Sequence, residues 1–289
     1  MKPLPNNMEY GNMPTFERAY IDQELKNIDD YLPAPISLYI IGGGAMSFYD
    51  LKTATKDIDV IVTNEKAATT LLTALQKSGY KKIEHVTSVY RRMKTRAVIE
   101  NNDGFRWDVF VNTVCGGLSL LDGMVARAQP FKKLNNIAIS LVSPEDIFIF
   151  KAVTSRPRDR EDMFILFSHG LDMTIIKEEI KRQAKLDEST AWLSFFFVGL
   201  DELVEEYHVI IPRYDEFLQM AENEMTERLI CAFLQKKSRT ISELAMLLQC
   251  EEKDIIKSLM VLKTQGLIQE KNDKFYRKRI NHDLLVADK

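Results

Sequence analysis

The sequence predicts an α+β fold, with a mixed sheet in the first half of the chain and helices in the second half. Short β-prone apolar runs alternate with amphipathic helical patterns up to about residue 143. Only helical patterns follow as far as about residue 224, and short helices and a hairpin complete the chain. Because 289 residues exceed the usual size of one domain, we expect three domains, at residues 1–143, 144–224 and 225–289.

The first domain is expected to begin with an amphipathic helix at residues 16–32, which Pro33 and Pro35 bring to an end. A glycine turn at residues 42–44 follows the first strand. The other elements are predicted from the period at which apolar residues recur and from β-branched residues. They are strands at residues 37–41, 58–62, 89–93, 97–100, 107–111 and 137–142, and helices at 45–49 and 65–78.

From residue 143 onwards we expect helices, followed by one hairpin near the end of the sequence. Ser143 and Pro144 form a helix start, because serine caps a helix and proline suits its first turn. Helices at residues 226–235, from Thr240, and at 251–263 precede a two-stranded hairpin at about residues 266–277. This order of elements predicts a C-terminal winged helix-turn-helix.

Composition indicates an ordinary globular protein, with 45% apolar residues and a net charge of -3. The three cysteines lack the spacing of a zinc site or a disulfide framework, which favours a reducing, cytoplasmic location. No apolar run is long enough for a membrane span, so we expect no membrane partner. The last segment carries a small excess of Lys and Arg, which fits either a nucleic-acid surface or a solvated one.

Two acidic residues bracket one apolar residue in the second predicted strand. Asp57 and Asp59 point to the same face, because side chains alternate along a strand. Asp108 lies within another apolar strand, where burial of an unpaired charge is costly. If the two strands are neighbours in the sheet, the three carboxylates predict a site for Mg²⁺ or Mn²⁺, since such cations prefer oxygen ligands.

The two glycines that follow the first strand are expected to bind phosphate. Gly42 and Gly43 lack side chains, which lets the backbone approach a phosphate group closely. Ser47 and Lys52, in the segment after these glycines, are candidate phosphate contacts. The sequence therefore places phosphate-binding groups close to the predicted metal ligands.

The glycine pair followed by the segment at residues 55–60 resembles the signature of the DNA polymerase beta-like nucleotidyltransferase superfamily. The chain is similar in particular to the toxin and abortive-infection branch, over residues 37–165. The resemblance implies a polymerase beta-like mixed sheet with flanking helices, and it assigns catalysis and metal binding to Asp57, Asp59 and Asp108. Gly43 stands where polymerase-like members often carry serine, which favours toxin-like or antibiotic-modifying branches over templated polymerases.

The same resemblance extends to a charged segment downstream. Lys151 and the run at residues 156–162 match a lysine and an Arg-x-x-Asp-like segment of these relatives. It implies that Lys151 and Arg158 contact the nucleotide phosphates and that Asp159 helps to position them. The alternative is a solvent-exposed helix surface whose ion pairs have no role in binding.

The expected function is transfer of a nucleoside monophosphate from a nucleoside triphosphate to an acceptor hydroxyl, on tRNA or other RNA. Lys253, Lys257 and Lys263 would contact the nucleic acid from the winged helix. A nucleotide-sensing DNA-binding regulator is one alternative, and transfer to a protein or an antibiotic is another. The winged helix would otherwise serve as a homodimer or docking contact, and a toxin–antitoxin role also follows from the resemblance.

Overall fold

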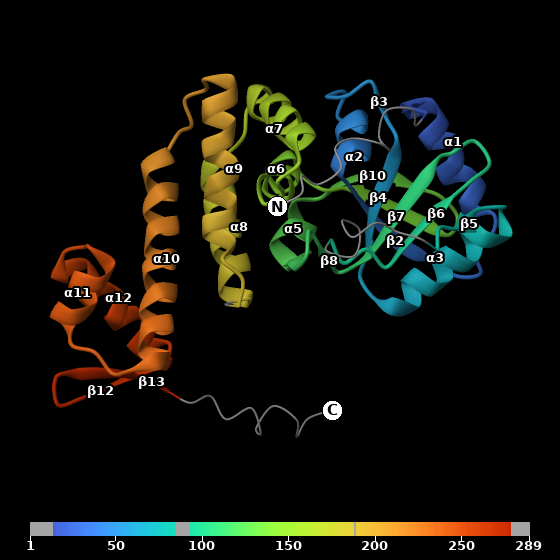
Figure 1. Ribbon diagram of the computed structural model, residues 1–289. Helices are drawn as coiled ribbons and strands as arrows, with labels where there is room; N and C mark the ends of the chain where they lie inside the picture. Colours follow the sequence, from blue (N-terminus) through green and yellow to red (C-terminus); the bar gives the residue numbers. More distant parts are fainter. Residues whose placement is uncertain (1–13, 85–92, 188, 279–289) are drawn as a thin grey trace, which may run out of the picture. The chain divides into compact units, whose positions relative to one another are not determined.

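The computed structural model describes residues 14–84, 93–187 and 189–278. Contacts within the chain divide it into two compact units, Met1–Ile210 and Ile211–Lys289, which are described separately below (Figure 1). The predicted boundary after residue 143 falls just before helix α6, Pro144–Ala152, and that after residue 224 falls inside helix α10, Tyr214–Lys236. The division into three domains stays a prediction.

The first unit is built on a mixed, seven-stranded sheet with the order β10-β11-β2-β4-β7-β6-β5. The pairs β11–β2 and β4–β7 are parallel, and the other neighbours are antiparallel. This confirms the α+β class. The strands, in sheet order, are β10 Gln129–Lys133, β11 Ile137–Leu141, β2 Ile36–Ile41, β4 Asp57–Val62, β7 Arg106–Val111, β6 Ala97–Glu100 and β5 Lys81–Lys82.

Two small antiparallel pairs accompany this sheet. They are β1 Phe16–Glu17 with β3 Ala54–Thr55, and β8 Thr113–Val114 with β9 Leu118–Ser119. The periodicity of the sequence did not reveal these pairs or β10, because strands this short or this exposed carry little apolar alternation. The strand predicted at residues 89–93 lies outside the described residues except for Met93, which is in a turn.

In the described parts of the chain before α6, which begins at Pro144, the helices are α1 Arg18–Asp29, α2 Gly42–Phe48, α3 Glu65–Lys77 and α5 Asp122–Arg127. Helices α2 and α3 pack against the central strands β2 and β4. Helix α3 begins after Asn64, whose side-chain oxygen accepts a hydrogen bond of 2.9 Å from the Ala67 amide. Its residues Ala68, Leu71 and Leu75 recur at helical spacing and are fully buried, so the apolar face of α3 fixes it to the sheet.

Helix α6 connects the sheet with the helices that follow. It packs against α2 and against α7 Pro157–His169, α8 Met173–Leu186 and α9 Trp192–Tyr207. The helix starts as predicted, with Ser143 Oγ accepting a hydrogen bond from the Asp146 amide and Pro144 in the first turn. Almost the whole of α6 is buried, which explains why it shows no amphipathic pattern.

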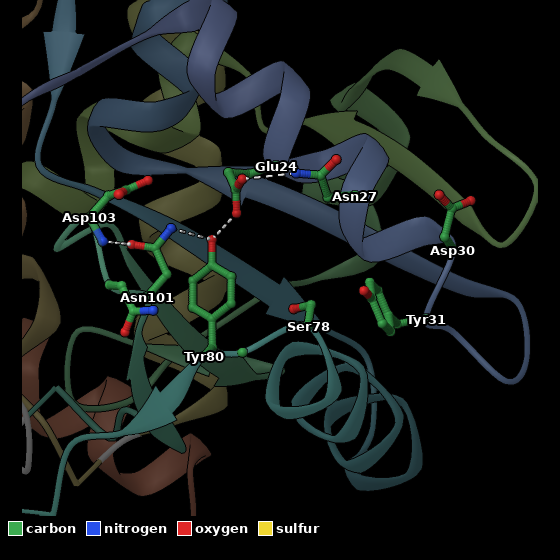
Figure 2. Close-up of a pocket in the computed structure, with 10 residues that line it drawn as sticks. Glu24, Asn27, Asp30, Tyr31, Ser78, Tyr80, Asn101 and Asp103 are labelled. Carbon is green, nitrogen blue, oxygen red and sulfur yellow. Dashed lines mark hydrogen bonds between the residues drawn. The ribbon is translucent and has the colours of Figure 1, made fainter.

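A polar pocket of about 390 Å³ lies between α1, the end of α3 and the turn that joins β6 to β7 (Figure 2). The Tyr80 hydroxyl donates a hydrogen bond to Glu24. Asn101 Nδ2 donates to the Tyr20 hydroxyl at 2.8 Å, and the Tyr20 hydroxyl donates to Asp103 Oδ2 at 2.7 Å. These hydrogen bonds tie α1 to the β6–β7 turn.

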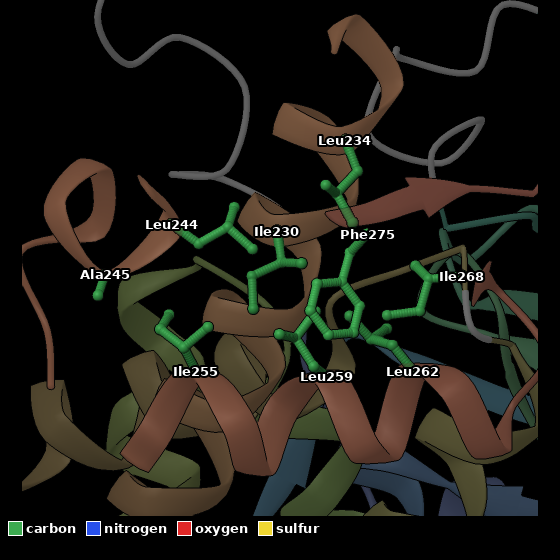
Figure 3. Close-up of a cluster of buried hydrophobic side chains, with 9 residues drawn as sticks. All are labelled: Ile230, Leu234, Leu244, Ala245, Ile255, Leu259, Leu262, Ile268 and Phe275. Carbon is green, nitrogen blue, oxygen red and sulfur yellow. The ribbon is translucent and has the colours of Figure 1, made fainter. Parts of the chain in front are cut away.

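The second unit contains α10, α11 Ile241–Leu248, α12 Glu252–Thr264 and the antiparallel strands β12 Ile268–Lys271 and β13 Lys274–Arg277. Helix α10 begins at Tyr214, earlier than the predicted start at residue 226. Thr240 and Glu243 form a capping box at α11. The three helices and the hairpin enclose one apolar core (Figure 3), which comprises Ile230, Leu234, Leu244, Ala245, Ile255, Leu259, Leu262, Ile268 and Phe275.

Among the residues that the structure describes, every helix is too short or too polar to cross a lipid bilayer.

Candidate active site

The three predicted acids meet on neighbouring parallel strands. In the register of β4 and β7, Asp59 lies directly opposite Asp108, and Asp57 lies two residues earlier on β4. Side chains opposite each other in a parallel pair share a face, as do residues i and i+2 of one strand. All three side chains line a cleft of about 220 Å³ in the first unit. The structure therefore brings the three acids together, and Asp57 and Asp59 share a face as their spacing predicted.

The acids disturb one another electrostatically. Burial raises the pKa of Asp59 to about 7, and the charge of Asp57 adds to this rise, although Lys151 and Arg156 oppose it. Burial also raises the pKa of Asp108 well above its ordinary value, and the charges of Asp59 and Asp57 raise it further. Full ionisation of all three acids at neutral pH therefore requires a compensating cation.

The Asp108 carboxylate provides the observation that tests the fit of a metal ion. Its Oδ1 atom is buried and has no hydrogen-bond partner within the described part of the chain. An unpaired buried carboxylate oxygen is destabilising, and a divalent cation would satisfy it. No three His, Cys, Asp or Glu side chains among the described residues form a ready-made metal site. The fit of Mg²⁺ or Mn²⁺ therefore rests on the oxygen donors and on their uncompensated charge.

Replacement Asp108→Asn is expected to stabilise the metal-free protein at pH 8. The carboxyl pKa values of Asp59 and Asp108 are raised in the folded protein, so ionisation of these groups is disfavoured there. The free energy of unfolding therefore falls as the pH rises above the pKa that these carboxyl groups have in the unfolded chain. The amide removes one of the repelling charges, so Tm should rise by at least about 2–4 °C, the change that 1 kcal/mol produces in a domain of this size. At pH 5 the gain should be smaller. Calorimetry in EDTA measures both, and an equal or larger gain at pH 5 would contradict the electrostatic explanation.

The two glycines lie directly beside these acids. A Cβ atom on Gly42 would lie 2.4 Å from Asp59 Oδ2, and one on Gly43 would lie 2.9 Å from Thr55 Oγ1. Gly42 also has a left-handed φ of 62°. Ser47 is buried, and its hydroxyl donates to the Gly43 carbonyl at 3.1 Å, so it fixes the first turn of α2 and does not line the cleft.

The replacement Gly42→Ala should therefore displace the Asp59 carboxylate, whereas Gly79→Ala should not. Both glycines have positive φ, but a Cβ on Gly79 would meet no atom within 4 Å. Left-handed strain should cost each variant about 1–2 kcal/mol of unfolding free energy. Only Gly42→Ala should also weaken the stabilisation by Mg²⁺, measured as the Tm shift on adding the ion. Equal metal responses of the two variants would contradict this assignment.

A buried network of ion pairs on α6 and α7 also borders the cleft. Lys151 Nζ, on α6, lies 2.8 Å from Asp159 Oδ1 and 2.7 Å from Asp162 Oδ2, both on α7. Arg156 adds a bidentate contact with Asp159, at 2.6 Å and 3.3 Å. Burial opposes ionisation of Asp159, but Lys151 and Arg156 lower its pKa to about 2. The predicted Lys151 and Asp159 thus form one charged unit.

Asp162 connects this network with a distant part of the sequence. Lys52 Nζ, in the segment after α2, lies 2.7 Å from Asp162 Oδ1, while Lys151 holds the other oxygen. Although burial opposes it, these two cations lower the pKa of Asp162. Both lysine side chains line the cleft. The carboxylate of Asp162 therefore sets the positions of two predicted phosphate contacts.

The cleft gathers most of the predicted residues and adds others. The predicted residues that line it are Gly43, Lys52, Asp57, Asp59, Asp108, Lys151 and Arg158. Gly42, Ser47 and Asp159 do not line the cleft, but they lie against the lining residues Asp59, Gly43 and Lys151, respectively. The residues that were not assigned from sequence are Thr15, Ala54, Thr55, Lys56, Met93, Arg156, Glu161 and Asp162. Arg156 and Asp162 belong to the charged run at residues 156–162 that the sequence analysis noted. The sequence pattern did not show which members of this run face the cleft.

The three lysines predicted to contact nucleic acid lie in the second unit. Lys253, Lys257 and Lys263 are exposed on α12. Lys253 Nζ pairs with Glu251 at 2.7 Å, and Lys263 Nζ pairs with Glu270 at 2.8 Å.

Comparison with known families agrees with this geometry. Residues 19–196, more than half of the 289-residue chain, match the model of a family described as nucleotidyltransferase of unknown function (DUF6036). A search of curated proteins finds no match. The matched segment includes every cleft-lining residue except Thr15. The chain therefore belongs to this family of nucleotidyltransferases.

Proposed function

We propose that the protein transfers a nucleoside monophosphate from a nucleoside triphosphate to an acceptor hydroxyl, with a divalent cation as cofactor. The observation that carries the proposal is the pairing of Asp59 with Asp108 across β4 and β7, together with the unsatisfied Oδ1 atom of Asp108, in a cleft that basic side chains also line. A polymerase beta-like fold fits the mixed sheet and the position of the acids at its centre.

The acidic wall would carry the chemistry. Asp57, Asp59 and Asp108 would hold Mg²⁺ or Mn²⁺, which supplies positive charge to the phosphates and to the attacking hydroxyl. The acceptor oxygen forms a bond to the α-phosphorus, the bond from that phosphorus to the bridging oxygen breaks, and pyrophosphate leaves. Asp108 is the proposed acceptor of the hydroxyl proton, because its carboxylate Oδ1 has no hydrogen-bond partner within the described part of the chain.

The cationic wall would position the triphosphate. Lys52, Lys151, Arg156 and Arg158 line the side of the cleft formed by the segment after α2 and by α6 and α7. Their charges favour the β- and γ-phosphates, and Arg158 is exposed at the cleft. The opposed walls would therefore orient the α-phosphorus towards the acids.

The second unit has the element order of a winged helix: helix, helix, helix and hairpin. We propose this fold for it, and RNA, tRNA included, as the first acceptor to test. Lys253, Lys257 and Lys263 are the proposed contacts if this unit delivers the RNA, and a toxin–antitoxin role would follow from transfer to tRNA. Protein and antibiotic acceptors are the other outcomes of the same experiment.

The test is incubation with each α-labelled nucleoside triphosphate, Mg²⁺ and total cellular RNA or cellular protein. Label should enter one acceptor class with the intact protein and with the control Glu205→Gln, an exposed acid on α9. It should be absent with Asp57→Ala/Asp59→Ala. Metal-dependent nucleotide binding without transfer to any acceptor would refute the enzyme and favour a nucleotide-sensing regulator. Transfer that survives loss of both acids would refute the assigned site.

A further inference from the structure

One face of α12 in the second unit carries a stripe of exposed residues with an acid at one end and a base at the other. The residues Glu252, Ile256, Met260 and Lys263 recur at intervals of four, four and three, so they lie on one side of the helix. Met260 is 64% exposed, which is unusual for a large apolar side chain. We call these four residues the α12 stripe.

The stripe lies away from the core of the unit. Ile255, Leu259 and Leu262 point from α12 into the apolar core that they share with Ile230 of α10 and Phe275 of the hairpin (Figure 3). Ile256 and Met260 each follow a core residue by one position, so they project from a different face. The core therefore leaves the α12 stripe uncovered.

The charge around the stripe does not favour a polyanion. Residues 251–263 contain three lysines and also three acids, Glu251, Glu252 and Asp254. A nucleic-acid surface is favoured by a net positive charge, whereas the charges of residues 251–263 are balanced.

The same charges complement a second copy of the helix. We propose that the α12 stripe is the centre of a two-fold homodimer interface in which the two α12 helices pack antiparallel. Glu252 and Lys263 lie about 16 Å apart along one helix. Antiparallel packing therefore places Glu252 of each copy opposite Lys263 of the other, at the two ends of the contact. It also brings Ile256 of each copy against Met260 of the other. The exposed contacts of Glu252 with Ser242 and of Lys263 with Glu270 are weak enough to exchange.

The neighbouring helix supplies further apolar surface. A stable interface buries about 800 Å² on each partner, which exceeds what one short stripe provides. Helix α11 packs against α12 and exposes Met246 by 78% and Leu247 by 40%. Ser242 Oγ of α11 donates to Glu252 of the stripe, and Met246 follows Ser242 by four residues, so Met246 lies on the side of α11 next to the stripe. The two helices of each copy would together provide an apolar centre with a charged edge, as in other homodimer interfaces.

Sedimentation of the full-length protein over a range of concentrations tests the interface. The intact protein should dimerise, and Met260→Asp should raise the dissociation constant at least tenfold, because the two-fold axis repeats the change in both copies. Ile210→Asp, at a residue that is 90% exposed in the first unit, is the matched control and should dimerise as the intact protein does. A monomer at every concentration, or a dimer unaffected by Met260→Asp, would overturn the proposal.

A charge swap tests the antiparallel arrangement and separates it from nucleic-acid binding. Glu252→Lys and Lys263→Glu should each weaken the dimer, since each places like charges opposite one another. The double variant should restore the dissociation constant to within about threefold of the original. Failure of this restoration would overturn the arrangement. RNA or DNA binding that Lys263→Glu removes and Glu252→Lys strengthens would assign the stripe to nucleic acid instead.

Discussion

Replacement Asp59→Asn is expected to abolish nucleotidyl transfer while the protein stays folded. Asp59 is the acid nearest to both others, since it follows Asp57 by two residues and lies opposite Asp108. Its carboxylate also lies over Gly42, where a Cβ would meet Oδ2 at 2.4 Å. An amide of the same shape keeps this packing but loses the negative charge. The transfer rate should therefore fall by at least about 10³-fold, as expected when a charged group of a preorganised site is removed.

The controls for Asp59→Asn follow from its environment. The metal-free variant should unfold at a temperature equal to or above that of the intact protein at pH 8, because burial and Asp57 raise the pKa of Asp59 to about 7 and so disfavour its charge. Addition of Mg²⁺ should raise Tm for the intact protein much more than for the variant. Full activity in Asp59→Asn would show that the acids are a structural cluster.

Replacement Lys151→Met is expected to destabilise the protein by about 3–5 kcal/mol, the usual effect of removing one partner from a buried ion pair. Methionine fills a similar volume but leaves Asp159 and Asp162 without the cation that contacts both, at 2.8 Å and 2.7 Å. Both acids are buried, and the pKa of Asp159 is lowered to about 2 only because cations surround it. Unfolding in urea measures the loss.

The pH dependence of Lys151→Met has a definite sign. In the intact protein Asp159 contributes stability above its unfolded pKa, and this contribution disappears as the pH falls from about 4 towards 2. In the variant, loss of Lys151 should raise the pKa of Asp159 from about 2 while Arg156 still opposes protonation, so the loss of stability should be smaller at pH 3 than at pH 8. Lys185→Met, an exposed lysine on α8, should change stability by less than about 0.5 kcal/mol. Equal losses for the two lysines would contradict the network.

The acids could be predicted from the sequence because their pattern is local. Asp57, Ile58 and Asp59 alternate with the period of a strand, and the apolar surroundings of Asp108 marked a second strand. What the sequence could not give was the register that sets Asp59 opposite Asp108, since that pairing joins residues 49 positions apart. The strand order likewise depends on contacts between distant segments.

The cationic wall could be predicted only in part, because its residues come from distant segments of the chain. The run at residues 156–162 predicted an ion-paired helix as readily as a phosphate site, because alternating charges have the same pattern in both. The structure shows that Asp159 and Asp162 face inward, whereas Arg158 is exposed. The contact of Lys52 with Asp162 spans 110 positions, which no periodicity reveals. The start of α10 at Tyr214 was missed because this helix has little amphipathic character.

The pairing of the cleft cations with Asp159 and Asp162 has a consequence for selectivity. Lys52, Lys151 and Arg156 are held by carboxylates, so an incoming anion must compete with these carboxylates for them. A small monovalent anion brings too little charge to do so, whereas a polyphosphate contacts several cations at once. The cleft should therefore ignore chloride and other abundant simple anions and respond to highly charged phosphate chains. In this way the protein would keep its binding site selective among the salts of the cell.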